Sequence, residues 1–118
     1  MLERREAIVD RYRSRLSSLT SQVVPKDCVA SPWLATFCAR DLYHRDAIVG
    51  ALEEAGIETR PVFIPLTLLP PYRTAHSSGP LIVSREIART GFCLPTYVGL
   101  TDGQIDEICD IIMSVSTP

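Results

Sequence analysis

The sequence predicts an α+β protein, a two-layer sandwich in which about four helices cover a small, mostly antiparallel three-stranded sheet. Three observations support this prediction. The 118 residues are enough for one domain, spanning residues 1–118. Apolar residues make up 46% of the chain and charged residues 22%, as in ordinary globular proteins. The apolar spacing alternates between helical stripes and short β-type runs, in the order helix, strand, helix, strand, loop, helix, strand, helix.

The first predicted element is an amphipathic helix over residues 2–19. Its apolar residues recur at spacings of four, four and three, which gathers them on one helical face: Ile8, Tyr12, Leu16 and Leu19. Asp10 and Arg13 have the spacing to pair along the exposed face. An extended link, broken by a proline, is expected to follow over residues 23–31.

A strand, a helix and a second strand are predicted for the middle of the chain. Residues 33–39 are apolar with aromatic and β-branched members, which indicates a strand buried on much of both faces. The helix is expected over residues 44–55, with an inner stripe of Ala47, Ile48, Ala51, Leu52 and Ala55. Gly56 suits the left-handed residue that ends a helix. Residues 57–64 are predicted to form an edge or bulged strand, or a loop after Arg60, because the proline that follows cannot donate a ladder hydrogen bond.

The last part of the chain combines an irregular stretch with two helices and one strand. Residues 65–79 contain three prolines and a Ser-Ser-Gly run, and so long a structureless segment in a small domain is more often functional or mobile than idle. Pro80 is expected to open a helix that closes before a strand at residues 92–94. Thr101 and Gln104 have the spacing of a capping box. The final helix then has the clearest apolar stripe: Ile105, Ile108, Cys109, Ile112 and Val115.

Composition and charge disfavour several classes of protein. The net charge is −2 and the isoelectric point is near 5.6, so no nucleic-acid partner is expected. No stretch approaches 18 uninterrupted apolar residues, so no membrane partner is expected either. The basic N-terminal segment contains acidic residues, which count against a signal or transit peptide and favour the cytoplasm. The cysteines form no C-x-x-C pair, which predicts reduced, half-buried side chains and no metal site: Cys28, Cys38, Cys93 and Cys109.

Few residues indicate catalytic chemistry by themselves. His44 is expected to be a surface or capping residue and His76 a loop residue, since neither has a catalytic partner nearby in sequence. Arg60 is more informative, because it ends a strand-like piece where the irregular stretch opens, and its planar fork suits carboxylate or phosphate. The alternative is a solvated arginine paired with Glu58 or Asp41.

Two longer segments resemble a known family. They are G-I-E-T-R-P-V-F-I-P-L-T-L-L-P-P-Y, from Gly56 to Tyr72, and G-F-C-L-P-T-Y-V-G-L-T-D-G-Q-I, from Gly91 to Ile105. Together they resemble the C-terminal small domain of the DegT/DnrJ/StrS sugar aminotransferases, and perosamine-synthase-like members look most similar. The resemblance extends back to the opening helix, which looks like the family's long helix leading into this domain.

The resemblance implies a role as part of a larger enzyme. The family consists of fold-type-I pyridoxal-phosphate enzymes that transfer an amino group from glutamate to a keto-sugar nucleotide. Its Schiff-base lysine belongs to a large domain, whereas the only lysine here, Lys26, stands where the family has no catalytic lysine. We therefore expect no catalytic or cofactor-binding residue in this chain, no pyridoxal phosphate bound by it alone, and no activity alone. The expected partner is an N-terminal pyridoxal-phosphate domain, in cis or in trans, and a homodimer is also left open.

The resemblance also implies four substrate-binding positions. Arg60 matches the arginine of the family's T-R-P element and would bind an anionic group of the amino donor or the nucleotide sugar. Phe63 matches an aromatic position that lines the site. Thr67 stands where relatives commonly have histidine, and Tyr72 could line the mouth of the site. Packing within the loop is the alternative for all four residues.

A second hypothesis belongs to a different class of protein. The chain would then be a free-standing interaction or small-ligand-binding module that reuses this α+β domain. An orphaned small domain should leave uncovered the apolar patch that a large domain would occupy, whereas an adapted module should have a polar surface.

Overall fold

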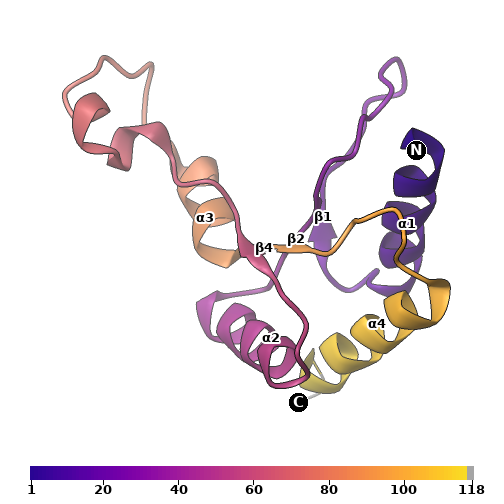
Figure 1. Cartoon of the computed structure of the whole chain (residues 1–118). Coiled ribbons are helices and arrows are strands. Elements are labelled where there is room, and N and C mark those ends of the chain that lie inside the picture. Colours follow the sequence, from indigo (N-terminus) through magenta and orange to yellow (C-terminus); the bar gives the residue numbers. More distant parts are fainter. Residues whose placement is uncertain (117–118) are drawn as a thin grey trace.

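The computed structural model describes residues 1–116 and contains four α-helices, four short strands and two 3₁₀ turns. In chain order these are α1 (Leu2–Arg15), β1 (Thr20–Ser21), β2 (Ala35–Cys38), α2 (Leu42–Glu54), β3 (Arg60–Pro61), η1 (Leu66–Leu68), η2 (Pro70–Tyr72), α3 (Ile82–Thr90), β4 (Gly91–Leu94) and α4 (Asp102–Ser116). Figure 1 shows the helices α1, α2 and α4 gathered beside the sheet. The predicted α+β class is confirmed.

The four strands form one antiparallel sheet in the order β1-β2-β4-β3. Because residues opposite each other in antiparallel strands share a face, Phe37 and Phe92 lie on the same side of the sheet, and Ala35 and Leu94 lie there too. All four side chains are buried. Arg60 and its following proline pair at the sheet edge, as predicted for a strand that contains proline.

One apolar core joins this sheet face to three helices. The helix predicted over residues 2–19 ends earlier, at Arg15, yet all four residues of its predicted stripe are buried. Tyr12 packs edge-on against Phe37 with ring centroids 6.3 Å apart. The Tyr12 hydroxyl donates a hydrogen bond to the carbonyl of Pro95, 3.1 Å away. Ile48 and Leu52 of α2 and the stripe of α4 complete the core. The helices therefore form the second layer.

Two helix ends follow the local chemistry predicted for them. The Thr101 hydroxyl accepts a hydrogen bond from the Gln104 backbone N–H at 3.2 Å, and the Gln104 side chain accepts one from the Thr101 N–H at 2.9 Å. At the end of α2, Gly56 has a positive φ of 75°. The N–H groups of Gly56 and Ile57 bond back to the carbonyls of Glu53 and Leu52, which satisfies the last turn.

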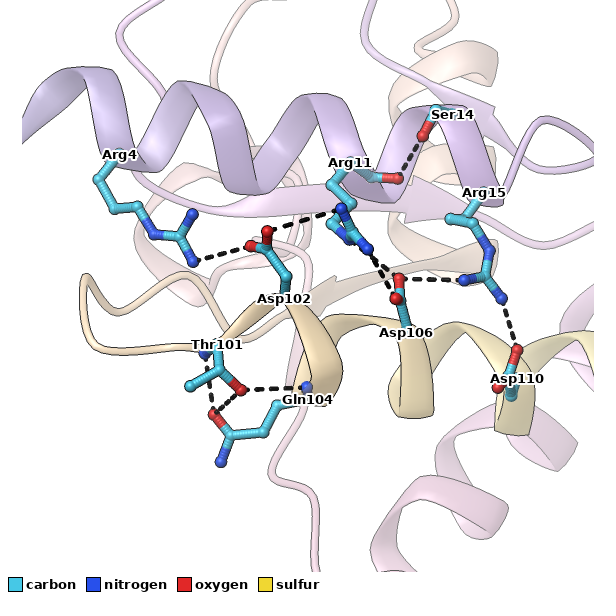
Figure 2. Close-up of polar contacts among 9 residues, drawn as sticks. All are labelled: Arg4, Arg11, Ser14, Arg15, Thr101, Asp102, Gln104, Asp106 and Asp110. Atoms are coloured by element: carbon cyan, nitrogen blue, oxygen red, sulfur yellow. Dashed lines mark hydrogen bonds and ion pairs between the residues drawn. The ribbon is translucent and has the colours of Figure 1, made fainter.

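A ladder of ion pairs fastens α1 to α4 (Figure 2). Arg11 holds Asp106 through two hydrogen bonds, at 2.9 and 2.6 Å. Arg15 contacts Asp106 at 3.0 Å and Asp110 at 2.5 Å. The hydrogen bond from Arg11 is the main reason that the pKa of Asp106 lies below its ordinary value. The ladder sets the register of the two helices, as planar guanidinium groups meet a row of carboxylates.

Residues 62–90, here called the arm, project from the sheet on the side away from α1 and α4 (Figure 1). No arm residue belongs to the apolar core described above. The radius of gyration is 15.4 Å, against about 13.5 Å for a compact chain of this length. The accessible surface is 8018 Å², against about 6,400 Å² for a compact protein of this mass. The arm and the link between β1 and β2, which also projects in Figure 1, give the protein this extended shape.

Three predictions about the sheet were wrong. The strand count is four rather than three, because Thr20 and Ser21, for which no strand was predicted, pair with β2. Trp33 is exposed and precedes β2, so that strand is shorter than predicted. The strand is also fully buried on one face only, since Thr36 and Cys38 are half-buried.

Other differences concern the helices. His44 is buried rather than on the surface, but it takes part in the cap of α2, as the other expectation for it had it. Its backbone N–H donates to the Asp41 carboxylate at 2.8 Å, and its Nδ1 accepts from the Arg40 N–H at 3.4 Å. Burial lowers the pKa of His44. Ala47 and Ala55 are exposed, so the inner stripe of α2 is narrower than predicted. Pro80 lies before the N-cap of α3 instead of opening the helix.

The cysteines are free and unequal in burial: Cys28 is exposed, Cys38 half-buried, and Cys93 and Cys109 buried. Burial raises the pKa of the Cys109 thiol to about 11. Among residues 1–116, no group of three or more potential metal ligands occurs. Within the same residues, no helix has the length and apolar character needed to cross a membrane.

Candidate functional site

A cavity of about 540 Å³ lies where α1, α4 and the ends of β3 and β4 meet. This volume is within the range of small-molecule sites. Trp33, Tyr97 and Leu100 contribute apolar wall, and Arg5 and Arg60 contribute positive charge. The loop from β4 to α4 is held in place here, since the Thr96 hydroxyl donates to the Trp33 carbonyl at 2.7 Å.

Arg60 is the predicted site residue that lines this cavity. Its backbone belongs to β3, in which Arg60 pairs with Cys93 of the neighbouring strand β4. Its side chain is 67% exposed and pairs with Glu58 at 3.6 Å. This contact is the surface pairing named as an alternative, and an exposed pair of this length contributes little to stability. The guanidinium therefore remains available to an anionic group.

A smaller cavity of about 470 Å³ lies beside the first and shares Trp33 and Leu34 with it. Phe63 lines this second cavity, where its ring centroid is 6.2 Å from that of Trp33, at an interplanar angle of 31°. The Phe63 side chain is otherwise exposed, as is Trp33. The two rings thus form an aromatic contact at the base of the arm, between the two cavities.

Thr67 and Tyr72 lie farther along the arm and line neither cavity. Thr67 belongs to η1, and its hydroxyl oxygen is buried without a hydrogen-bond partner among the described residues. Tyr72 belongs to η2 and is half exposed. The structure therefore brings Arg60 and Phe63 to neighbouring cavities, while the substrate-binding role of all four residues stays a prediction.

Two contributors to the cavities were not identified from the sequence as site residues. Trp33 was assigned to a buried strand, although the proline before it is a signal that the strand begins later. Arg5 lies in the basic N-terminal helix, in which no site residue was expected, yet it lines the larger cavity. No local sequence pattern distinguishes Arg5 from the other arginines of α1. The difference appears only when α4 packs against α1 and its aspartates pair with Arg4, Arg11 and Arg15.

The comparisons with known proteins agree on one family. Residues 1–113 match the family model for DegT/DnrJ/EryC1/StrS aminotransferases. The chain is 32% identical over 116 residues to the GDP-perosamine synthase of Vibrio cholerae, covering 95% of this chain and 32% of the relative. It is also 32% identical over 114 residues to the GDP-perosamine synthase of Caulobacter vibrioides, covering 91% of this chain and 30% of the relative.

A solved structure supports the same assignment. The structure of S. venezuelae DesV in complex with a ketimine intermediate matches with a TM-score of 0.85 and 25% identity, covering 98% of this chain and 32% of DesV. The chain belongs to the DegT/DnrJ/EryC1/StrS aminotransferase family. It spans about a third of the length of the relatives it matches.

Proposed function

We propose that this chain is the closing C-terminal domain of a pyridoxal-phosphate-dependent nucleotide-sugar aminotransferase. The observation that carries the proposal is the family match over residues 1–113, in a chain that spans about a third of its relatives. The reaction would move an amino group from glutamate to a keto-sugar nucleotide in the cytoplasm. The chain would act with an N-terminal domain supplied in cis or in trans, and it would be inactive alone.

The arm supports the presence of such a partner. Its exposed apolar side chains come from the loops and from α3: Phe63, Ile64, Leu66, Leu68, Tyr72, Ile82, Val83 and Ile87. Soluble monomers rarely expose apolar side chains in such a continuous series. Covering this surface with a large domain would remove it from water, at a favourable free energy proportional to the area buried.

Within this proposal, Arg60 would bind the substrate. Its position on β3 is held by hydrogen bonding to the central strand, while its side chain reaches the cavity from the sheet edge. A guanidinium binds a carboxylate or phosphate through two parallel hydrogen bonds, which fixes the orientation of the bound group. Phe63 and Trp33 would supply an apolar surface beside it.

The residues of this chain do not fit pyridoxal phosphate. Such a site needs a lysine in a pocket that lowers its pKa and orients the cofactor. Lys26 is exposed in the segment between β1 and β2, and it lines neither cavity. We therefore assign the Schiff-base chemistry to the N-terminal domain.

A chimera tests the proposal directly. The region of the Vibrio cholerae GDP-perosamine synthase that matches this chain is replaced by residues 1–118, and the activity of that relative is measured. We expect a soluble, active chimera in which Arg60→Gln raises the KM about tenfold, while Arg40→Gln, at an exposed position outside the arm and both cavities, leaves it unchanged. A folded chimera without activity, beside an active parent enzyme, would contradict the proposal.

The inactivity of the chain alone has its own test. The isolated chain is mixed with pyridoxal phosphate and treated with borohydride, and peptide mass spectrometry locates any adduct. We expect only slow, substoichiometric labelling of the exposed amines. A stoichiometric adduct specific to Lys26 would show that this chain holds the cofactor itself.

The second candidate, a free-standing interaction or ligand-binding module, is favoured only by the two cavities. The exposed apolar side chains of the arm count against it, because an adapted module would have a polar surface. Analytical ultracentrifugation over a concentration range separates the two candidates. Self-association indicates an uncovered interface, whereas a monomer at every concentration favours the module.

A further inference from the structure

Arg5 differs from the other arginines of α1. Arg4 pairs with Asp102, and Arg11 and Arg15 belong to the ladder shown in Figure 2. Arg13 pairs with an aspartate on its own helix. Among the described residues, the Arg5 side chain has no ion pair and no hydrogen bond, and its Nε atom is buried without a partner.

A buried guanidinium N–H without an acceptor is unusual. The Nε of Arg13 is also buried without a partner, but Arg13 has an ion pair, whereas Arg5 has none. Buried N–H groups almost always have a partner, and the exceptions call for an explanation by function or by an absent ligand. Arg5 lies on the wall of the 540 Å³ cavity described above. The missing acceptor could therefore be supplied by a molecule in that cavity, on the side formed by α1.

The remaining walls define the rest of the ligand. Trp33 and Tyr97 offer two aromatic rings, and Leu100 and Ile108 add aliphatic surface. Rings of this kind favour a flat, apolar body through stacking and edge contacts. Gln104 is also on the wall. Its side-chain oxygen is already committed to the capping box, which leaves its amide N–H₂ group to donate beside Arg5.

The charges in the cavity set the charge of the ligand. Two arginines, Arg5 and Arg60, and two glutamates, Glu58 and Glu107, line the cavity, so its formal side-chain charges cancel. A molecule with several negative charges would meet repulsion from the glutamates, whereas a single carboxylate matches the one unpartnered guanidinium. We infer that the cavity binds a small monocarboxylate with an aromatic body, whose carboxylate accepts hydrogen bonds from Arg5.

This inference goes beyond the proposed function, in which Arg5 has no part. The two also fail separately: the chimera measures Arg60 in catalysis, while the test below measures binding to the isolated chain. Neither result bears on the other.

The test uses the 118-residue chain and 3-phenylpropionate as the probe. Trp33 is the only tryptophan, so its fluorescence and its indole N–H resonance report on the cavity wall without interference. The Nε–H resonance of Arg5 reports on the unsatisfied donor. We expect saturable changes in all three signals, with the Arg5 Nε–H moving downfield as it gains an acceptor.

Variants and analogues separate binding at Arg5 from general apolar binding. Arg5→Gln should weaken binding of 3-phenylpropionate at least about tenfold, because it removes the charged fork, and Arg5→Lys should restore part of the affinity. Arg85→Gln, on the exposed face of α3, should have no effect. The neutral analogue 3-phenylpropan-1-ol should bind wild type as weakly as the carboxylate binds Arg5→Gln.

Stability measurements exclude a purely structural role for Arg5. Because its guanidinium has no partner, Arg5→Gln should leave the urea midpoint of unfolding unchanged or raise it. Three results would overturn the inference: no saturable change with 3-phenylpropionate, equal affinity of wild type and Arg5→Gln, or tighter binding of phenyl phosphate than of the carboxylate.

Discussion

Apolar side chains are buried at one end of the molecule and exposed at the other. Between α1 and α4, apolar residues such as Ile8 and Ile105 are fully buried, and the surrounding arginines are paired with aspartates. Along the arm, by contrast, Ile82 is 70% exposed and Val83 is 71% exposed. Both regions carry apolar side chains on helices, yet only those between α1 and α4 are buried by the chain itself.

The comparison separates self-sufficient structure from structure that needs a partner. The α1–α4 side is stabilised by residues of this chain, so mutations there should act on folding. The arm contributes no residue to the core, so mutations there should leave folding nearly unchanged and act on association. The following variants test this division, from the largest expected effect to the smallest.

Removing the same side-chain atoms on the two sides should have very different costs. Ile105→Ala, at a position with no exposure, should lower the free energy of unfolding by about 2–5 kcal/mol. Ile82→Ala on the arm should change it by no more than about 0.5 kcal/mol. Urea unfolding followed by circular dichroism measures both. Similar losses for the two variants would show that the arm is part of the folded core.

Glycine substitutions probe the junction where the arm rejoins the sheet. A Cβ at Gly91 would lie 2.5 Å from the Ile87 carbonyl oxygen and 2.6 Å from Val62 Cγ2, so Gly91→Ala should cost about 1–3 kcal/mol. Gly50→Ala in α2 meets nothing within 4 Å and should instead stabilise by about 0.5–1 kcal/mol. Thermal unfolding of the two variants should therefore shift in opposite directions. A neutral Gly91→Ala would mean that the arm moves freely at this point.

The capping box gives a smaller effect on the self-sufficient side. Thr101→Ala removes the hydroxyl that accepts from the Gln104 N–H, and it should cost about 1 kcal/mol. Thr74→Ala is the matched control on the exposed part of the arm, and it should be neutral within about 0.5 kcal/mol. Chemical unfolding measures both variants. An equal loss in the control would attribute the effect to threonine itself and not to the cap.

The ladder between α1 and α4 predicts a dependence on acid. Pairing with Arg11 lowers the pKa of Asp106 in the folded state. The ionised carboxylate therefore stabilises the fold at pH values above its ordinary pKa of 3.8. That contribution is lost as the pH falls from about 4 through the lowered pKa. Asp106→Asn should make the free energy of unfolding depend less on pH in this acidic range. Asp27→Asn, at an exposed loop position, should leave that dependence unchanged. High salt should reduce the difference, and a difference that persists in salt would argue against the ion pairs.

The sequence was informative wherever the signal is local. The stripe of α1 at Ile8, Tyr12 and Leu16 is buried as its spacing predicted, and the capping box at Thr101 forms as expected. These features depend on residues within a few positions of one another. In the candidate site, Arg60 was identified because its neighbours form a specific run of residues, and the comparisons support the family that this run indicated.

Features that depend on distant residues were missed. β1 forms because Thr20 and Ser21 pair with β2, and their polar side chains do not by themselves predict a strand. His44 is buried by the packing of α2, although its sequence neighbours are polar. The contact between Phe63 and Trp33 joins two segments thirty residues apart, so neither residue alone indicates it.

The sequence by itself determined the α+β class, the apolar faces of α1 and α4, the end of α2, the start of α4 and the family. These follow from periodicity, capping chemistry and two runs of residues that resemble a known family. Only the tertiary structure decided which arginine of α1 has no carboxylate partner, because Arg5 and Arg11 look alike until α4 is placed against them. It also decided that the arm's apolar face has no cover from its own chain, since burial is a property of the packed molecule and not of any residue in it.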